Sequence, residues 1–156
     1  MTKTILALVV ALSSTFAYAG QHCPNLSGSY VSDHPQFSGI VFEVEQDDCQ
    51  AVNLTKFDQN GKQVDEPDFH LMDGEMKDAS DGTFYSNKWI DNKAVFTVIS
   101  KDRTGSIYTR EGKEISFYKL MMVLEAKNKN LVMHIVSYSG IAKTNYEDSI
   151  VFTRKP

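Results

Sequence analysis

The fold of this chain is decided by residues 119–138, which read KLMMVLEAKNKNLVMHIVSY. Two β-prone runs flank the turn residues 128–130, and the simplest structure for them is a hairpin. The register about that turn pairs Leu120 with Ser137, Met122 with Ile135, and Leu124 with Met133. One face of the hairpin then carries no charge; it consists of Leu120, Met122, Leu124, Ala126, Leu131, Met133 and Ile135. Because successive strand residues point to opposite faces, we expect this face to point inward.

Short β-prone runs separated by turn residues continue along the rest of the chain. We predict strands at residues 26–31, 40–46, 49–57, 83–90, 94–100, 106–109, 113–126, 131–138 and 148–154. Residues 73–81 could hold either a helical turn or a surface loop. Asn60-Gly61 is a strong turn signal, and most other runs are also joined to their sequence neighbours by short turns.

This pattern predicts an all-β protein, in which an up-and-down antiparallel meander of about eight to ten strands is closed into a small barrel. Closure is favoured because it removes exposed strand edges. A sandwich of two sheets is the alternative, although it usually needs longer connections. The chain has no internal repeat or linker, so we expect one domain over residues 20–156.

The first residues have the pattern of an export signal. Lys3 precedes an apolar run over residues 5–17, and Ala17-Tyr18-Ala19 forms a small-x-small cleavage site. The run is shorter than the roughly 20 residues that span a bilayer. We therefore predict a cleaved signal peptide over residues 1–19 and a mature protein without a membrane span, periplasmic or secreted.

The chain contains two cysteines, Cys23 and Cys49. In an exported domain a disulfide between them is the simplest expectation. If residues 26–31 and 40–46 form a hairpin that pairs Leu26 with Gln46, continuing the same register brings Cys23 opposite Cys49. The bond would then close the open end of this hairpin.

The two ends of the predicted domain suggest a family. The segment from Cys23 to Tyr30 contains a Gly-x-aromatic string, and the chain closes with Val151-Phe152-Thr153-Arg154. These ends resemble the first and last strands of lipocalin-like (calycin) β-barrels. The resemblance implies that Gly28, Tyr30 and Arg154 form a structural cap at the closed end of the barrel. Tyr30 replaces the tryptophan typical of that family.

Residues suited to chemistry are scattered. The histidines, at positions 22, 34, 70 and 134, lack metal-ligand spacing, so we predict no metal site. Asp58-x-Asn60-Gly61 partly matches a calcium loop but is better explained as a turn. There is no Gly-x-Ser-x-Gly elbow, phosphate loop or identifiable carboxylate pair. We therefore predict no catalytic residue, no cofactor and no enzymatic activity.

The formal net charge of the chain is −4, and loss of Lys3 with the signal peptide would make it one unit more negative. This charge, without a cluster of Lys or Arg, argues against nucleic acid as a partner. We expect a monomer.

The preferred function is noncatalytic binding of a small apolar or amphipathic ligand inside the barrel. The predicted ligand-binding residues are Leu120, Met122, Leu124, Met133 and Ile135, with Phe42, Val44 and Phe152 as further candidates. Methionines at such positions also commonly fill a core.

Two other functions remain open. One is binding of an envelope protein, as by a hydrolase inhibitor, through the loop from Asp33 to Ser38 or the acidic segment from Asp65 to Asp81. The other is a purely structural role in the envelope, with a filled core.

Overall fold

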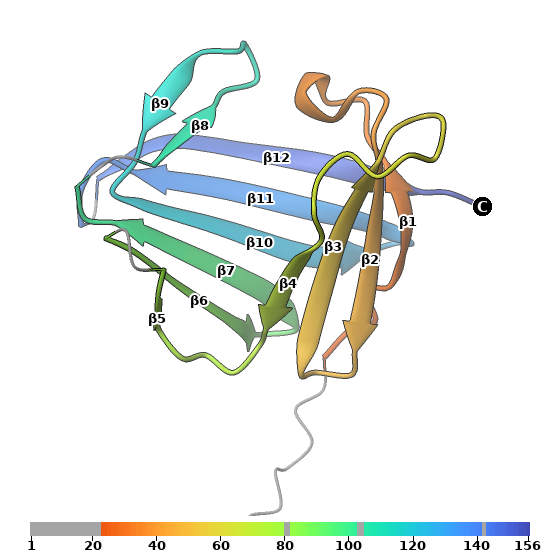
Figure 1. The fold of residues 1–156 in the computed structure, drawn as a ribbon, viewed down its shortest axis with the longest axis horizontal. Helices are drawn as coiled ribbons and strands as arrows, with labels where there is room; N and C mark the ends of the chain where they lie inside the picture. Colours follow the sequence, from red (N-terminus) through yellow and green to blue (C-terminus); the bar gives the residue numbers. More distant parts are fainter. Residues whose placement is uncertain (1–22, 80–81, 103–104, 142) are drawn as a thin grey trace, which may run out of the picture.

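The computed structural model describes residues 23–79, 82–102, 105–141 and 143–156. The predicted signal peptide therefore lies outside the described residues. The described part of the chain is almost entirely antiparallel β structure, as expected, with one short 3-10 helix. Figure 1 shows one long, strongly curved sheet with a small hairpin rising from its rim. The elements are β1 (Gly28–Val31), η1 (Pro35–Phe37), β2 (Val41–Asp47), β3 (Ala51–Phe57), β4 (Asp68–Leu71), β5 (Lys77–Asp78), β6 (Thr83–Ile90), β7 (Lys93–Ser100), β8 (Ser106–Tyr108), β9 (Glu114–Ser116), β10 (Lys119–Lys127), β11 (Asn130–Tyr138) and β12 (Thr144–Arg154).

The main sheet has ten strands in the order β4-β3-β2-β1-β12-β11-β10-β7-β6-β5. Strands β1–β4 run crosswise to β6, β7 and β10–β12, so the sheet folds over on itself (Figure 1). Only two residue pairs of the β1–β12 ladder join these two halves, Tyr30 with Arg154 and Val31 with Thr153.

This strand order differs from the closed barrel predicted from the sequence. In a closed barrel the two strands at the ends of the order would pair, whereas here β4 and β5 form the two edges of the sheet. Near these ends, the Gly74 amide donates to the Asn87 carbonyl at 2.9 Å, and the Asn87 side chain donates to the Leu71 carbonyl at 3.4 Å. The ends are thus linked by turn and side-chain hydrogen bonds, whereas a closed barrel would need a further strand ladder.

The predicted register of the decisive hairpin is confirmed. In β10 and β11, Leu120 pairs with Ser137, Met122 with Ile135, and Leu124 with Met133. Leu124 and Leu131 are fully buried, and Leu120 and Met133 are nearly so. The uncharged face therefore faces the core, although Ala126, near the turn, is exposed.

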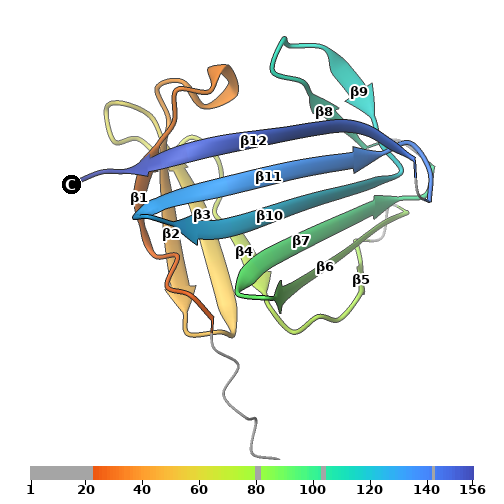
Figure 2. The same ribbon diagram turned by 180° about the vertical axis from the view of Figure 1, so that it is seen from behind.

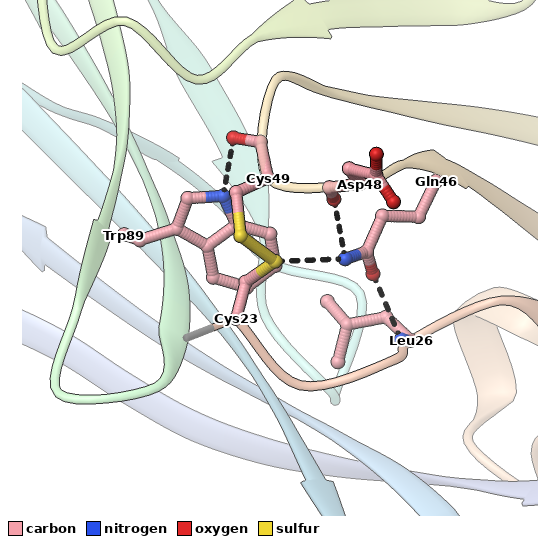
Figure 3. The surroundings of a disulfide bond; sticks show 6 residues. All are labelled: Cys23, Leu26, Gln46, Asp48, Cys49 and Trp89. Carbon is pink, nitrogen blue, oxygen red and sulfur yellow. Dashed lines mark hydrogen bonds between the residues drawn. A yellow bond between two sulfur atoms is a disulfide. The ribbon is translucent and has the colours of Figure 1, made fainter. Parts of the chain in front are cut away.

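The first hairpin and its disulfide are also confirmed. Strands β1 and β2 pair in the expected register, with Tyr30 opposite Phe42. The Cys23–Cys49 bond closes the open end of this hairpin, away from its turn. Figure 3 shows Trp89 beside the bond. The Trp89 indole N–H donates to the Cys49 carbonyl at 2.9 Å, and the Gln46 side chain accepts from the Leu26 amide at 2.9 Å.

The three residues of the expected structural cap lie together. The Arg154 guanidinium carbon is 6.0 Å from the centre of the Tyr30 ring, and an Arg154 amino group donates to the Ser27 carbonyl at 2.7 Å. A Cβ atom on Gly28 would lie only 2.9 Å from the Arg154 Nε atom. A side chain at this position would push the guanidinium aside, and the φ of +155° at Gly28 is one that other residues rarely adopt.

Two details of the secondary structure differ from the expectation. Residues 113–126 form two strands, β9 and β10, because β9 pairs with β8 outside the main sheet and the chain returns to that sheet only after Phe117, whose side chain is buried. Strand β5 lies in the segment 73–81, for which we predicted a helical turn or a surface loop, and β4 lies where we predicted no strand. Among the described residues, no helix has the length and apolar character to cross a membrane.

Candidate functional site

A cavity of about 610 Å³ opens between the inner face of the sheet, the η1 loop and the β8–β9 hairpin. Both the η1 loop and the hairpin rise from the same rim of the sheet (Figures 1 and 2). The sheet contributes Leu120, Met122 and Ile135 to the lining, the η1 loop contributes Pro35 and Gln36, and the hairpin contributes Ile107, Tyr108, Thr109, Arg110 and Gly112.

Three of the five predicted ligand-binding residues line this cavity, namely Leu120, Met122 and Ile135. The other two, Leu124 and Met133, lie in the core cluster and outside the lining. The weaker candidates Phe42, Val44 and Phe152 are also buried in that cluster, where the rings of Phe42 and Phe152 stack with centroids 5.3 Å apart. The inner face thus divides into a packed core and a hollow end.

Alternation along the strands explains why the hollow end is apolar. Met122 and Ile135 are opposite one another on β10 and β11, two positions from the fully buried Leu124. Their side chains are only partly buried, because the described residues that lie over them belong to the η1 loop and the β8–β9 hairpin and leave the cavity between. Such a concave, mainly apolar hollow suits a small ligand with little polar surface.

A polar network borders the cavity. Asp148, opposite Ile135 on β12, faces inward and accepts hydrogen bonds from His34 Nε2 at 3.1 Å and from the Tyr146 hydroxyl at 2.9 Å. The Arg110 guanidinium is a looser partner at 3.5 Å, and its side chain is 52% exposed. An inward-pointing carboxylate is tolerated here because these groups replace the water it would otherwise bind.

The network shifts the pKa values of two of its members, Asp148 and Tyr146. Burial acts to raise the pKa of Asp148, but the Ser149 amide, Tyr146, His34 and Arg110 outweigh burial, so this pKa is lowered. The pKa of Tyr146 is raised, mainly by burial.

His34 is already fully engaged in this arrangement. Its Nδ1 accepts from the Gln36 amide at 3.3 Å, and its Nε2 therefore carries the proton shared with Asp148 at 3.1 Å. A general base needs a free nitrogen within reach of a substrate. The contacts of His34 instead suit it to fix the η1 loop to β12.

Two other described histidines, His70 and His134, and the acidic turn at Asp58 lie outside the cavity lining. His70 packs against Phe96 with ring centroids 4.6 Å apart, and burial lowers its pKa. The Asp58 side chain accepts from the Asn60 and Lys62 amides, and so it caps its own turn. Within the described ranges, no group of three or more His, Cys, Asp or Glu side chains could hold a metal ion.

Sequence reasoning missed the residues that the hairpin and the η1 loop bring to the cavity. Gln36 and Arg110 come from turn segments and Ile107 from a short predicted strand, and only the positions of the η1 loop and the β8–β9 hairpin in the complete fold bring them to the cavity. Asp148 was located only at the start of the predicted last strand, which begins four residues earlier in the structure.

No protein-family model and no curated protein matches the sequence. Among solved structures, the chain is similar to a crystal structure of a mutant of the fluorescent protein UnaG, with 16% sequence identity and a TM-score of 0.47. The match covers 75% of this chain and 72% of that chain.

Proposed function

We propose that this protein is an exported, noncatalytic binding protein that holds a small apolar or amphipathic ligand within a lipocalin-like β-barrel, the edges of which are linked by turn and side-chain hydrogen bonds and not by a strand ladder. The observation that carries the proposal is the hollow of about 610 Å³ over Leu120, Met122 and Ile135. Its volume lies in the range of small-molecule sites, and partly buried apolar side chains in such a site are stabilised when a ligand displaces water from them.

Two features support export. The N-terminal sequence has the order of a charged residue, an apolar run and a small-x-small site. The Cys23–Cys49 disulfide fits an oxidising compartment. Edman sequencing or mass spectrometry of the mature protein tests this part, and an N-terminus at Gly20 is the expected result.

Two neighbouring methionines provide a matched test of ligand binding. Met122 lines the cavity, whereas Met121 points to the opposite face of β10. The neutral fluorescent probe N-phenyl-1-naphthylamine should brighten on binding to the wild-type protein. Met122→Trp should weaken its binding at least tenfold by filling the hollow, and Met121→Trp should leave it within about twofold. Absence of binding by the wild type, or equal binding by both variants, would contradict the proposal.

Native mass spectrometry of protein purified gently from its own host addresses the natural ligand. A co-purifying small molecule that is released on denaturation would give its chemical class. The same molecule should be missing from Met122→Trp purified in parallel, because a molecule adsorbed elsewhere would survive the substitution.

One observation favours protein binding as the second candidate. The predicted protein-binding segment, residues 65–81, exposes Phe69, Leu71 and Met76, and the Phe69 side chain is 64% exposed. Exposed apolar side chains that lie close together often mark interaction sites. Phe69→Ser should abolish capture of a specific envelope protein and spare probe binding, whereas Met122→Trp should have the reverse effect.

A further inference from the structure

The β8–β9 hairpin is an excursion from the main sheet. Strand β7 pairs directly with β10, with Ile99 opposite Lys119, so the intervening residues are not needed to complete the sheet. Within the described part of the chain, β8 and β9 pair only with one another. The hairpin can therefore change its position without breaking a ladder of the main sheet.

Few apolar contacts hold the outer part of this hairpin. Ile107 and Ile115 are only partly buried, and Tyr108 is 58% exposed. A two-stranded hairpin with so little buried apolar surface has marginal stability by itself. Its position over the cavity must therefore depend on its bonds to the rest of the molecule.

Those bonds are polar and come from Gln36 on the η1 loop and from Asn145, Tyr146 and Asp148 on β12, where the Asp148 carboxylate lies 3.5 Å from the Arg110 guanidinium. The Gln36 amide group donates to the carbonyls of Tyr108 and Thr109. The Arg110 amide donates to the Tyr146 hydroxyl at 3.0 Å. The Asn145 amide group, at the β-bulge of β12, donates to the Ser116 carbonyl at 3.2 Å.

The base of the hairpin is fixed more firmly. The Gly105 amide donates to Ser100 Oγ at 3.2 Å, and the Phe117 amide donates to the Gly105 carbonyl at 3.0 Å. The buried Phe117 ring packs so closely on Gly105 that a Cβ atom there would lie 2.6 Å from it. The hairpin thus has a packed base and a tip held by hydrogen bonds that water can replace.

We propose that the β8–β9 hairpin is a lid on the cavity, and that Gln36 and Tyr146 form the latch that holds it closed. This inference rests on the proposed function, because a lid has a role only where a ligand enters. Ile107 on the inner side of the lid faces the same hollow as Met122 and Ile135. Opening the latch widens the path to these side chains, so the latch controls how fast a ligand enters and leaves.

Hydrogen exchange of the ligand-free protein tests the lid by itself. The Arg110 amide is protected only while its bond to Tyr146 is closed, and Gln36→Ala weakens the latch without touching that bond. Loss of the Gln36 bonds should raise the exchange rate of the Arg110 amide about fivefold. The control is Ser106→Ala, which removes a hydrogen bond to Glu114 within the hairpin and should have no such effect.

Stopped-flow binding of N-phenyl-1-naphthylamine tests the control of access. Tyr146→Phe removes a latch hydroxyl from a residue outside the cavity lining. Its association and dissociation rate constants should both rise about fivefold, and the dissociation constant should stay within about twofold.

The two experiments distinguish a failure of the lid proposal from a failure of the proposed ligand-binding function. An unchanged Arg110 exchange rate in Gln36→Ala, or an equal increase in Ser106→Ala, overturns the lid whether or not the probe binds. Unchanged rate constants in Tyr146→Phe also overturn it. If the wild type fails to bind the probe while the exchange rates change as expected, the ligand-binding function is wrong and the hairpin still opens.

Discussion

Removal of the Cys23–Cys49 bond should destabilise the protein by an amount that depends on the length of the chain segment closed by the bond. The bond joins residues 26 positions apart. In the chain-entropy model, closing a loop of this length is worth about 3.5 kcal/mol at 25 °C. For a domain of about 130 to 140 residues this corresponds to a decrease of about 12 °C in the melting temperature. The double variant Cys23→Ser/Cys49→Ser should show both effects.

Trp89 supplies the assay because it is the single tryptophan of the chain and lies beside the bond. Its indole N–H donates to the backbone carbonyl of Cys49, which the serine variant keeps. The fluorescence of Trp89 should therefore report unfolding in urea for both proteins, and the free energies follow by linear extrapolation. Reduced wild type is the control and should match the serine variant. A loss below about 1 kcal/mol would refute the loop-entropy reasoning.

Three further predictions concern stability. Gly28→Ala should cost about 1–3 kcal/mol by urea unfolding, because its φ of +155° strains an L side chain and its Cβ atom would push the Arg154 guanidinium aside. Gly140→Ala, which meets nothing within 4 Å, should be nearly neutral. Leu124→Ala should cost about 2–5 kcal/mol in the same assay, since Leu124 is fully buried, and a loss below this range would show that the core collapses around the gap. The lowered pKa of Asp148 in the folded protein should stabilise the fold at neutral pH, and this contribution should be lost as the pH falls through that pKa. Asp148→Asn should therefore weaken the decrease of the unfolding free energy on the acid side of a plot against pH, and an unchanged plot would contradict this.

The parts of the fold that were predictable have a strong local signal. In β10 and β11, alternation over nine residues on each side of a two-residue turn fixes the register, because a slip by one position would turn Leu124 and Met133 outward. The register of the first hairpin likewise brought Cys23 opposite Cys49.

The missed elements lack such a signal. Strands β4 and β5 contain four and two residues, and β4 exposes Phe69 and Leu71, so neither shows a buried face in its sequence. The split of residues 113–126 was hidden because Phe117 is buried outside the main sheet, where its apolar character mimics a continuous strand.

The candidate site was partly predictable for a related reason. The pattern of β10 and β11 assigns Leu120, Met122 and Ile135 to the inner face, but burial along that face depends on what covers it. The cover consists of the η1 loop and the β8–β9 hairpin, and no local pattern shows that Gln36 reaches Thr109, 73 residues away. Long-range side-chain contacts of this kind are fixed only by the complete fold.

The ladder between β1 and β12, which has two residue pairs, has a consequence for the order of folding. Strands β1 to β4 can form their local hairpins early, but Tyr30 and Val31 have to wait for Arg154 and Thr153, over 120 residues later, before the crosswise halves join. Contacts so distant in sequence slow folding, because the intervening chain loses entropy before the contact forms. Until Arg154 and Thr153 have been synthesised, β1 therefore lacks its partner on β12, and the two crosswise halves of the sheet cannot be joined through this ladder.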